Sequence, residues 1–417
     1  MNILFIHQNF PGQFLHLAPA LVKKGHTVTC LVPDNNKNKK IPGLVYREYN
    51  LTRGSTKGVH HWVVEIESQA IRAEACFEAA LKLKNEGFHP ERIISHNGWG
   101  ESLFLKNVWP FARLGLYGEF YYHSDGYDVG FDEEIQPKKE NSACRIAYKN
   151  VNNMMSLSGA HDMICPTEWQ AESFPPEYRS KITIVHDGID TNKLSPNPNS
   201  TITLSSGLTL TTGSEVVTFV SRNLEPYRGY HIFMRALPRL LEKRPNLRIM
   251  IVGGDGVSYG SAPEPIKGIK QSWKTLFIDE VKSKIKPEDW ARVHFVGTIP
   301  YGTYVNLMQI SSVHIYLTYP FVLSWSLLEA MSMGAAIVAS DTQPVEEYIK
   351  DGETGLLFDF FDSESLSKLV SKLLADPKER SRLGKNARDF AISELDLTNK
   401  CLPKQISWVE SVNQTPY

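Results

Sequence analysis

Short apolar runs alternate with helically spaced apolar positions along the first half of the chain. Residues 3–6 form a continuous apolar run, which is typical of a buried strand, and a glycine-containing loop follows. Apolar residues then recur at helical spacing from Phe14 to Val22, and residues 27–32 form the next apolar run. This strand–loop–helix–strand order predicts the start of a parallel α/β sheet. Further strands are expected at residues 92–95, 116–122, 162–165 and 182–185.

The same alternation restarts after a break in the middle of the chain. Residues 195–214 are rich in Pro, Asn, Ser, Thr and Gly, which indicates a linker at 196–214 with a small hairpin at 201–211. Apolar positions from Ile232 to Leu241 predict an amphipathic helix, and the tail from residue 363 is also expected to be helical. Strands are expected at residues 216–220, 247–252, 293–296, 313–317 and 335–339.

Two strand–helix arrays predict an α/β protein with two Rossmann-like domains that face a cleft. The expected divisions are an N-terminal domain (1–195), the linker (196–214), a C-terminal domain (215–385) and a C-terminal helical segment (386–417) that crosses back to the first domain. Ligands of such sheets bind at the carboxyl ends of the strands, so polar residues that follow strands are the candidate site residues.

Composition and charge narrow the class of protein. The net charge of -1 argues against a nucleic-acid binder, which usually carries a basic excess. The five cysteines are widely spaced and form no C-x-x-C pair, so we expect reduced thiols in a cytoplasm. We also expect no signal peptide and no membrane-spanning segment. The basic run at residues 37–40 is either a solvated face or a peripheral contact with anionic lipid at the cell membrane.

Two arginines provide the strongest local signal. Arg222 ends an expected strand, and Arg228 stands just before the next helix. Two guanidinium groups at a strand end can bracket a pyrophosphate through paired hydrogen bonds. The alternative is that both arginines form surface ion pairs, as most arginines do.

A second signal lies where the expected strand at 313–317 leads through a short loop into a helix. The backbone amides of Leu323, Ser324 and Trp325 stand at the expected helix start, which suits a phosphate or another anion. Glu329 follows in the first turns and could accept both hydroxyls of a ribose. The spacing Ser326-x-x-Glu329 also fits a capping box, which would give the glutamate a purely structural role.

Histidines and acids at other strand ends are secondary candidates. Polar groups there point at bound ligand in a doubly wound sheet, although a lone histidine or a Gly-Asp turn is often only structural. A metal site at His123 with Asp125 and Asp128 is a weaker reading, since no acidic cluster accompanies them. The secondary candidates are His96, Asn97, Asp125, His186 and Asp190.

Taken together, these segments resemble glycosyltransferase family 4, a group of retaining enzymes with two Rossmann-like domains (the GT-B fold). The similarity extends over nearly the whole chain. It is carried by the opening MNILFIHQNFPG, the turn VHDGID at 185–190, the two arginines, the segment LEAM at 328–331 with the later Gly334, and DGETGLL at 351–357. Asp187 stands where the family usually has Asn, and Arg228 where it usually has Lys.

The resemblance implies that the N-terminal domain (1–195) is the acceptor side and that the C-terminal domain (215–385) binds the nucleotide-sugar. It also implies a role for each candidate. Arg222 and Arg228 would hold the diphosphate, and Glu329 would bind the ribose hydroxyls of a UDP- or GDP-type nucleotide-sugar. The amides of residues 323–325 would lie near the phosphates or the sugar. Gly12 would let the backbone approach the donor or acceptor, and His123 would lie near the reacting sugar. No metal and no other cofactor would be needed, and the acceptor would be a glycan or a lipid-linked molecule.

One position departs from the family pattern. The family usually carries a second glutamate eight residues before Glu329, and this chain has Phe321 there. Three hypotheses therefore remain: a retaining glycosyltransferase of surface polysaccharide or glycoconjugate synthesis, a nucleotide-sugar binding protein with little turnover, and a nucleotide-sugar epimerase on the same fold.

Overall fold

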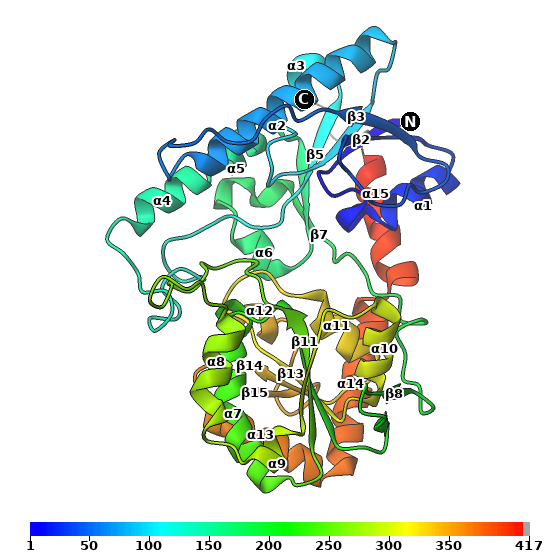
Figure 1. Ribbon diagram of the computed structural model, residues 1–417. Helices are drawn as coiled ribbons and strands as arrows, with labels where there is room; N and C mark the ends of the chain where they lie inside the picture. Colours follow the sequence, from blue (N-terminus) through cyan, green and yellow to red (C-terminus); the bar gives the residue numbers. More distant parts are fainter. Residues whose placement is uncertain (412–417) are drawn as a thin grey trace. The chain divides into compact units, whose positions relative to one another are not determined.

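The computed structural model describes residues 1–411 and divides them into two compact units (Figure 1). The first unit contains Met1–Gly188 together with the chain from Leu397 onward, and the second contains Ile189–Asp396. The prediction that the C-terminal helical segment returns to the first domain is therefore confirmed for the part after Asp396. The segment expected to be a linker, 196–214, lies inside the second unit.

The first unit is built on a seven-stranded sheet in which every neighbouring pair is parallel. The strand order is β3-β2-β1-β4-β5-β6-β7, so the order reverses direction between β1 and β4. In sheets of this kind the reversal opens a crevice at the carboxyl ends of the two strands. The strands are β1 (Asn2–Ile6), β2 (Thr27–Pro33), β3 (Val45–Tyr49), β4 (Arg92–His96), β5 (Arg113–Tyr117), β6 (Asp162–Cys165) and β7 (Ile182–Ile184).

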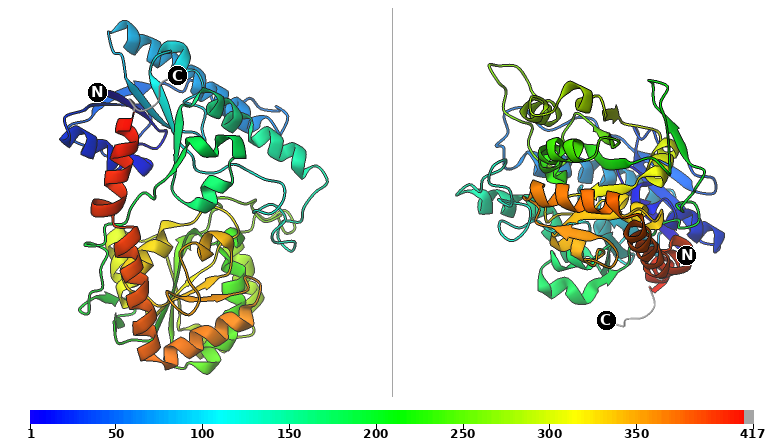
Figure 2. Two further views of the ribbon diagram at one scale, coloured as in Figure 1. Left: turned by 180° about the vertical axis from the view of Figure 1, so that it is seen from behind. Right: turned by 90° about the horizontal axis from the view of Figure 1, so that it is seen from below.

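Helices cover both faces of this first sheet. The core on one face contains residues of α2, α3, α5 and α6, and the core on the other face contains residues of α1 and α15, which lie side by side (Figure 2). The C-terminal α15 contributes Trp408 and Val409 to that second core. The helices are α1 (Leu17–Lys23), α2 (Val64–Asn85), α3 (Leu105–Val108), α4 (Ser142–Lys149), α5 (Val151–Gly159), α6 (Glu168–Glu172) and α15 (Leu402–Glu410).

The second unit repeats the same plan with a six-stranded parallel sheet of order β12-β11-β10-β13-β14-β15. Its strand order reverses between β10 and β13, so that a second crevice is expected at the ends of those strands. The strands are β10 (Val216–Asn223), β11 (Arg248–Gly254), β12 (Val293–Gly297), β13 (Val313–Tyr316), β14 (Ile337–Ser340) and β15 (Leu356–Phe358). The prediction of two Rossmann-like domains is confirmed.

The helices of the second unit also form two groups. α7, α8 and α13 pack together, and α10, α11 and α14 contribute to a core on β13 and β14 (Figure 1). No helix within residues 1–411 is long and apolar enough to cross a membrane. The helices are α7 (Tyr230–Lys243), α8 (Trp273–Lys282), α9 (Pro287–Trp290), α10 (Tyr301–Ile310), α11 (Trp325–Ser332), α12 (Gln343–Glu346), α13 (Ser363–Ala375) and α14 (Pro377–Glu394).

The predicted hairpin at 201–211 is present as β8 (Thr201–Thr203) and β9 (Thr209–Thr211). Leu210 on β9 is buried in a core with Val216, Met250 and Leu307. The polar composition of this segment reflects its exposed face, because its apolar positions pack on the second sheet.

One expected strand was placed too far along the chain. The strand expected at 116–122 ends at Tyr117 as β5. Beyond it, backbone amides bond to side chains instead of to a neighbouring strand: Tyr121 N–H donates to Ser173 Oγ, and Tyr122 N–H donates to Asn150 Oδ1, each at 3.0 Å. The apolar and aromatic run in the sequence therefore continues as a loop above the sheet, and the loop carries site residues.

Candidate functional site

The crevice of the second unit lies at the ends of β10 and β13. Arg222 near the end of β10 is exposed, and Arg228 follows in the short turn before α7. Both line a small cavity of about 60 Å³. Other residues that line it are Ser221, Glu225, Tyr259, Tyr316, Leu317 and Ser324.

Arg228 is a buried cation that is held by neutral groups. Its Nη1 donates to Thr318 Oγ1 at 2.6 Å and to the Val322 carbonyl at 3.0 Å. Its guanidinium carbon lies 4.9 Å from the ring centre of Tyr259. Within residues 1–411, neither Arg228 nor Arg222 has a carboxylate at ion-pair distance. Arg228 is buried and therefore forms no surface ion pair, although the carboxylate of Glu225 lines the same cavity. The role of the exposed Arg222 stays a prediction.

Glu225 places Tyr259 over Arg228. This carboxylate is buried and accepts hydrogen bonds from the backbone N–H groups of Ser258 at 3.0 Å and Tyr259 at 3.3 Å. The Glu225 carboxylate is thus stabilised by backbone N–H groups of the loop after β11. The loop in turn carries the aromatic ring that covers the guanidinium group.

The start of α11 differs from the capping box that the sequence allowed. The N-cap is Ser324, and its hydroxyl accepts from the backbone N–H of Ser326 at 3.4 Å. The Tyr316 hydroxyl accepts from Ser324 N–H at 2.8 Å. Ser326 is inside the helix, so a Ser326–Glu329 capping box is wrong. The first turn of an α-helix directs otherwise unpaired N–H groups outward, which favours an anion there.

Glu329 lies one turn further along α11. The Tyr301 hydroxyl donates to its Oε1 at 2.7 Å. Burial raises the pKa of Glu329, because a partly desolvated carboxylate is less stable than its neutral form. Free of a capping role, this carboxylate can exchange its tyrosine partner for a hydroxyl of a ligand.

Phe321 stands where the resemblance implied a glutamate. Its side chain is 6 % exposed and its ring centre lies 5.3 Å from Tyr259 and 5.8 Å from Tyr227. The phenylalanine therefore extends an aromatic wall beside Arg228 and offers no hydrogen bond to a ligand.

In the first unit, three histidines at or just after strand ends each make the same kind of hydrogen bond. In each, the ring Nδ1 accepts from the backbone N–H two residues later, which leaves the proton of the neutral ring on Nε2. The pairs are His7 with Asn9 N–H at 2.9 Å, His96 with Gly98 N–H at 3.0 Å, and His186 with Gly188 N–H at 3.0 Å.

Gly12 gives room to one of these rings. Its φ of +47° is a left-handed conformation, and a Cβ there would lie 2.5 Å from His7 Cε1. His7 Nε2 donates to Gln13 Oε1 at 2.8 Å. Gly12 therefore allows the loop after β1 to close over the buried imidazole.

His7 makes the stability of the first unit depend on pH. Burial lowers its pKa from 6.5 to about 3, so the unfolded chain takes up the proton first as the pH falls. The contribution is complete well above pH 6.5 and is lost progressively as the pH falls through that value. Between about pH 7.5 and about pH 5.5 the loss of unfolding free energy amounts to about 1.4 kcal/mol. In urea unfolding at these two values, His7→Gln should lose less stability than the unchanged chain; equal losses would contradict this.

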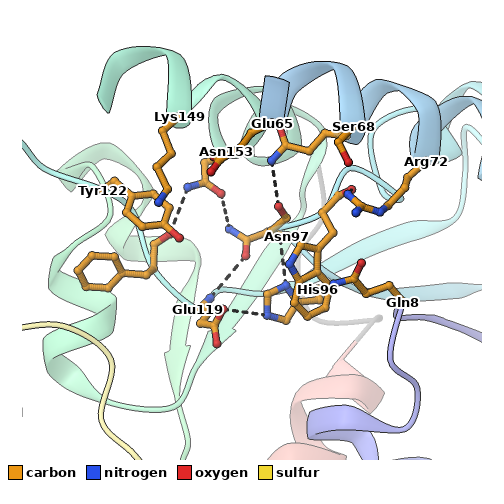
Figure 3. A pocket seen from close by; sticks show the side chains of 14 residues that line it. Gln8, Glu65, Ser68, Arg72, His96, Asn97, Glu119, Tyr122, Lys149 and Asn153 are labelled. Carbon is orange, nitrogen blue, oxygen red and sulfur yellow. Dashed lines mark hydrogen bonds and ion pairs between the residues drawn. The ribbon is translucent and has the colours of Figure 1, made fainter. Parts of the chain in front are cut away.

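A larger cavity of about 310 Å³ lies at the carboxyl ends of β1, β4 and β5, close to the reversal of strand order (Figure 3). His96 forms part of its wall, with Trp99 stacked on it at 4.1 Å and Tyr117 at 5.5 Å between ring centres. Asn97 Nδ2 donates to Asn153 Oδ1 at 3.0 Å. The predicted residues His96 and Asn97 therefore belong to one site.

The other first-half candidates do not line this cavity. His123 stacks on Tyr127 at 4.2 Å, and its Nε2 forms a 2.6 Å hydrogen bond with the Ser173 carbonyl. Asp125 is exposed and pairs with Lys138. Within residues 1–411, no three His, Cys, Asp or Glu side chains lie together as a metal site would require.

Two candidates lie near the boundary between the units. The His186 ring is buried, and burial lowers its pKa to about 4. The His186 carbonyl accepts from Gln405 of α15 at 2.9 Å. Asp190, in the second unit, pairs with Lys193 at 2.9 Å. These contacts hold the local chain in place, and neither residue lines one of the two cavities.

Each half of the chain matches a family model of known proteins. Residues 24–194 match the family model described as glycosyl transferase family 4 group, and residues 204–390 match glycosyl transferases group 1. The chain is a GT-B glycosyltransferase. It is 26 % identical over 214 residues to a D-inositol 3-phosphate glycosyltransferase of Corynebacterium efficiens, a match that spans 51 % of this chain and 47 % of that protein, about half its length.

Solved structures agree with this fold. Sucrose-phosphate synthase of Thermosynechococcus elongatus superposes with a TM-score of 0.73 at 16 % identity, with full coverage of both chains. Anabaena HepE in complex with UDP-glucose gives a TM-score of 0.64 at 15 % identity, covering 99 % of this chain and 100 % of that one.

Sequence reasoning missed several residues around the larger cavity of the glycosyltransferase. Glu119 follows the end of β5. It was not recognised as a residue after a strand, because the strand was expected to continue to residue 122. The others come from the helices α2 and α4 and the start of α5, where no motif marks them: Glu65, Gln69, Arg72, Lys149 and Asn153.

Proposed function

We propose that this glycosyltransferase binds a nucleoside-diphosphate-sugar of the UDP or GDP type in its second unit without a metal ion. The observation that carries the proposal is the pair of arginines at the end of β10, which have no carboxylate at ion-pair distance within residues 1–411. Guanidinium groups form charge-assisted, paired hydrogen bonds with phosphate oxygens. HepE, a protein of the same fold, has been solved with UDP-glucose.

The proposed donor would use three groups of the second unit. Arg222 and Arg228 hold the diphosphate, the amides of Leu323 and Trp325 near the start of α11 add neutral donors, and Glu329 accepts the ribose hydroxyls. The Ser324 amide is already bonded to the Tyr316 hydroxyl. As the sugar leaves, negative charge grows on the diphosphate, where fixed cations stabilise it most. The transferred sugar keeps its anomeric configuration, and the leaving phosphate takes the proton of the acceptor hydroxyl.

The proposed acceptor is a glycan or a lipid-linked molecule of surface polysaccharide or glycoconjugate synthesis in the cytoplasm. With methyl glycosides as probes and each donor in turn, a product that is heavier by one sugar should form. NMR of its anomeric proton should show the configuration of the donor. An inverted product would contradict the retaining mechanism.

A thermal-shift panel tests the donor site. One diphosphate among UDP, GDP, ADP and dTDP should stabilise the enzyme by about 2.7 kcal/mol when present at about 100 times its dissociation constant. The shift should be the same with magnesium and with EDTA, because the arginines supply the positive charge. A shift that appears only with magnesium would sink the metal-free proposal.

A further inference from the structure

The loop after β11 carries a short hairpin that presents two isoleucines. Ile266 and Ile269 exchange both of their backbone hydrogen bonds, at 3.1 and 2.9 Å, across a two-residue turn. The turn residues Lys267 and Gly268 have φ values of +50° and +77°, as a tight hairpin turn requires. Residues of such a hydrogen-bonded pair lie directly opposite each other, so both isoleucine side chains leave the hairpin on the same face.

The hairpin tip, residues 266–270, combines apolar and basic side chains in solvent. Ile266 is 51 % exposed and Ile269 is 66 % exposed. Lys267 and Lys270 are exposed as well, and neither side chain forms a hydrogen bond or an ion pair within residues 1–411. Single exposed apolar residues are ordinary, but two side by side on an ordered turn with two unpaired cations suit a partner that is both apolar and anionic.

The base of this loop is held in place beside the donor-side cavity. Trp273 Nε1 donates to the Ser261 carbonyl at 2.9 Å. The Glu225 carboxylate accepts from the Tyr259 N–H at 3.3 Å, and the Tyr259 ring lies over Arg228. The tip therefore projects from a fixed base, and whatever the tip binds is connected through a few residues to the cavity of the second unit.

A lipid surface fits this tip better than a protein does. The tip is convex and too small to supply the roughly 800 Å² that each partner contributes to a stable protein interface. A second copy of the chain would bring the same lysines together across a two-fold axis, where their charges repel. A bilayer needs no matching shape, because isoleucines can enter the acyl boundary while lysines stay at the level of anionic headgroups.

We propose that the hairpin tip inserts into the surface of a membrane that contains anionic lipid. Ile266 and Ile269 supply the apolar contact, and Lys267 and Lys270 supply the attraction to the headgroups. Two side chains of each kind give weak, reversible binding. The inference does not depend on the donor proposal, since contact with lipid needs no nucleotide.

Flotation of the full chain with vesicles tests the proposal. At low salt the chain should bind vesicles of equal parts phosphatidylcholine and phosphatidylglycerol roughly tenfold or more tightly than vesicles of phosphatidylcholine alone, because both lysines gain from an anionic surface. Added salt should weaken this binding. Ile266→Ser/Ile269→Ser should weaken it by roughly tenfold or more, since less apolar surface is buried. Lys267→Gln/Lys270→Gln should lose the preference for anionic vesicles.

Ile392→Ser is the matched control. It removes an isoleucine of α14 in the same unit that is 41 % exposed, and it should float like the unchanged chain. Equal urea midpoints show that the variants are folded. No binding to anionic vesicles, or binding that is kept in Ile266→Ser/Ile269→Ser and lost in Lys39→Gln/Lys40→Gln, would overturn the proposal. A dimer in vesicle-free solution that the double isoleucine variant dissociates would assign the tip to a second copy and would overturn it too.

Discussion

Arg228→Met is expected to lower turnover by roughly 10²- to 10³-fold, the effect of removing one fixed donor to a growing negative charge. The side chain is buried and fixed by Thr318 and Val322, so its charge is already in place before the donor arrives. Methionine keeps most of the volume and removes the charge. Affinity for the diphosphate should fall with turnover, as measured by titration and by initial rates.

Two further variants make this result specific. Arg228→Lys keeps the charge and should retain part of the affinity. Arg239→Ala removes a half-buried arginine of α7 that pairs with Glu364, and it should behave like the unchanged enzyme. If Arg228→Met turned over donor at the normal rate, the diphosphate would not lie at the end of β10.

Gly229→Ala is expected to destabilise the second unit by roughly 2–5 kcal/mol. Gly229 has a φ of +65°, and a Cβ there would lie 2.3 Å from Leu317 Cβ, so either the turn or β13 must move. Because the turn also carries Arg228, donor binding should weaken with stability. Urea unfolding of the full chain measures the first effect, and diphosphate titration measures the second.

Gly297→Ala is the matched control for backbone strain. Gly297 has the same φ of +65°, but no atom lies within 4 Å of the position of a Cβ. Its alanine variant should lose only the strain cost of about 1–2 kcal/mol. Equal losses in the two variants would mean that the contact with Leu317 relaxes freely.

The strand pattern in the sequence was sufficient to predict the two parallel sheets. Buried strands of a parallel sheet are continuous apolar runs, and residues 3–6, 162–165 and 216–220 all fall within strands of the structure. β3 was not predicted because it is an edge strand with mostly exposed side chains. β15, which has only three residues, was also missed.

The donor-side candidates could be predicted because they follow strands directly. Arg222 and Arg228 line one cavity at the end of β10, as their spacing indicated. Glu119 and Lys149 could not be predicted in the same way. Their common site depends on where β5 ends and on how α4 lies beside α2, and both follow from tertiary packing. His123 attracted attention by its residue type, yet its imidazole bonds to the Ser173 carbonyl.

Titration of the preferred nucleoside diphosphate into the enzyme and into Arg222→Ala, both in EDTA, tests the central proposal most directly. Arg222 is exposed, and within residues 1–411 its side chain forms no hydrogen bond or ion pair, so its removal should leave the protein folded. The arginine clamp predicts saturable binding without metal and a dissociation constant raised by roughly 10- to 100-fold in the variant. Equal affinity in the variant, or binding by the unchanged enzyme only after magnesium is restored, would contradict it.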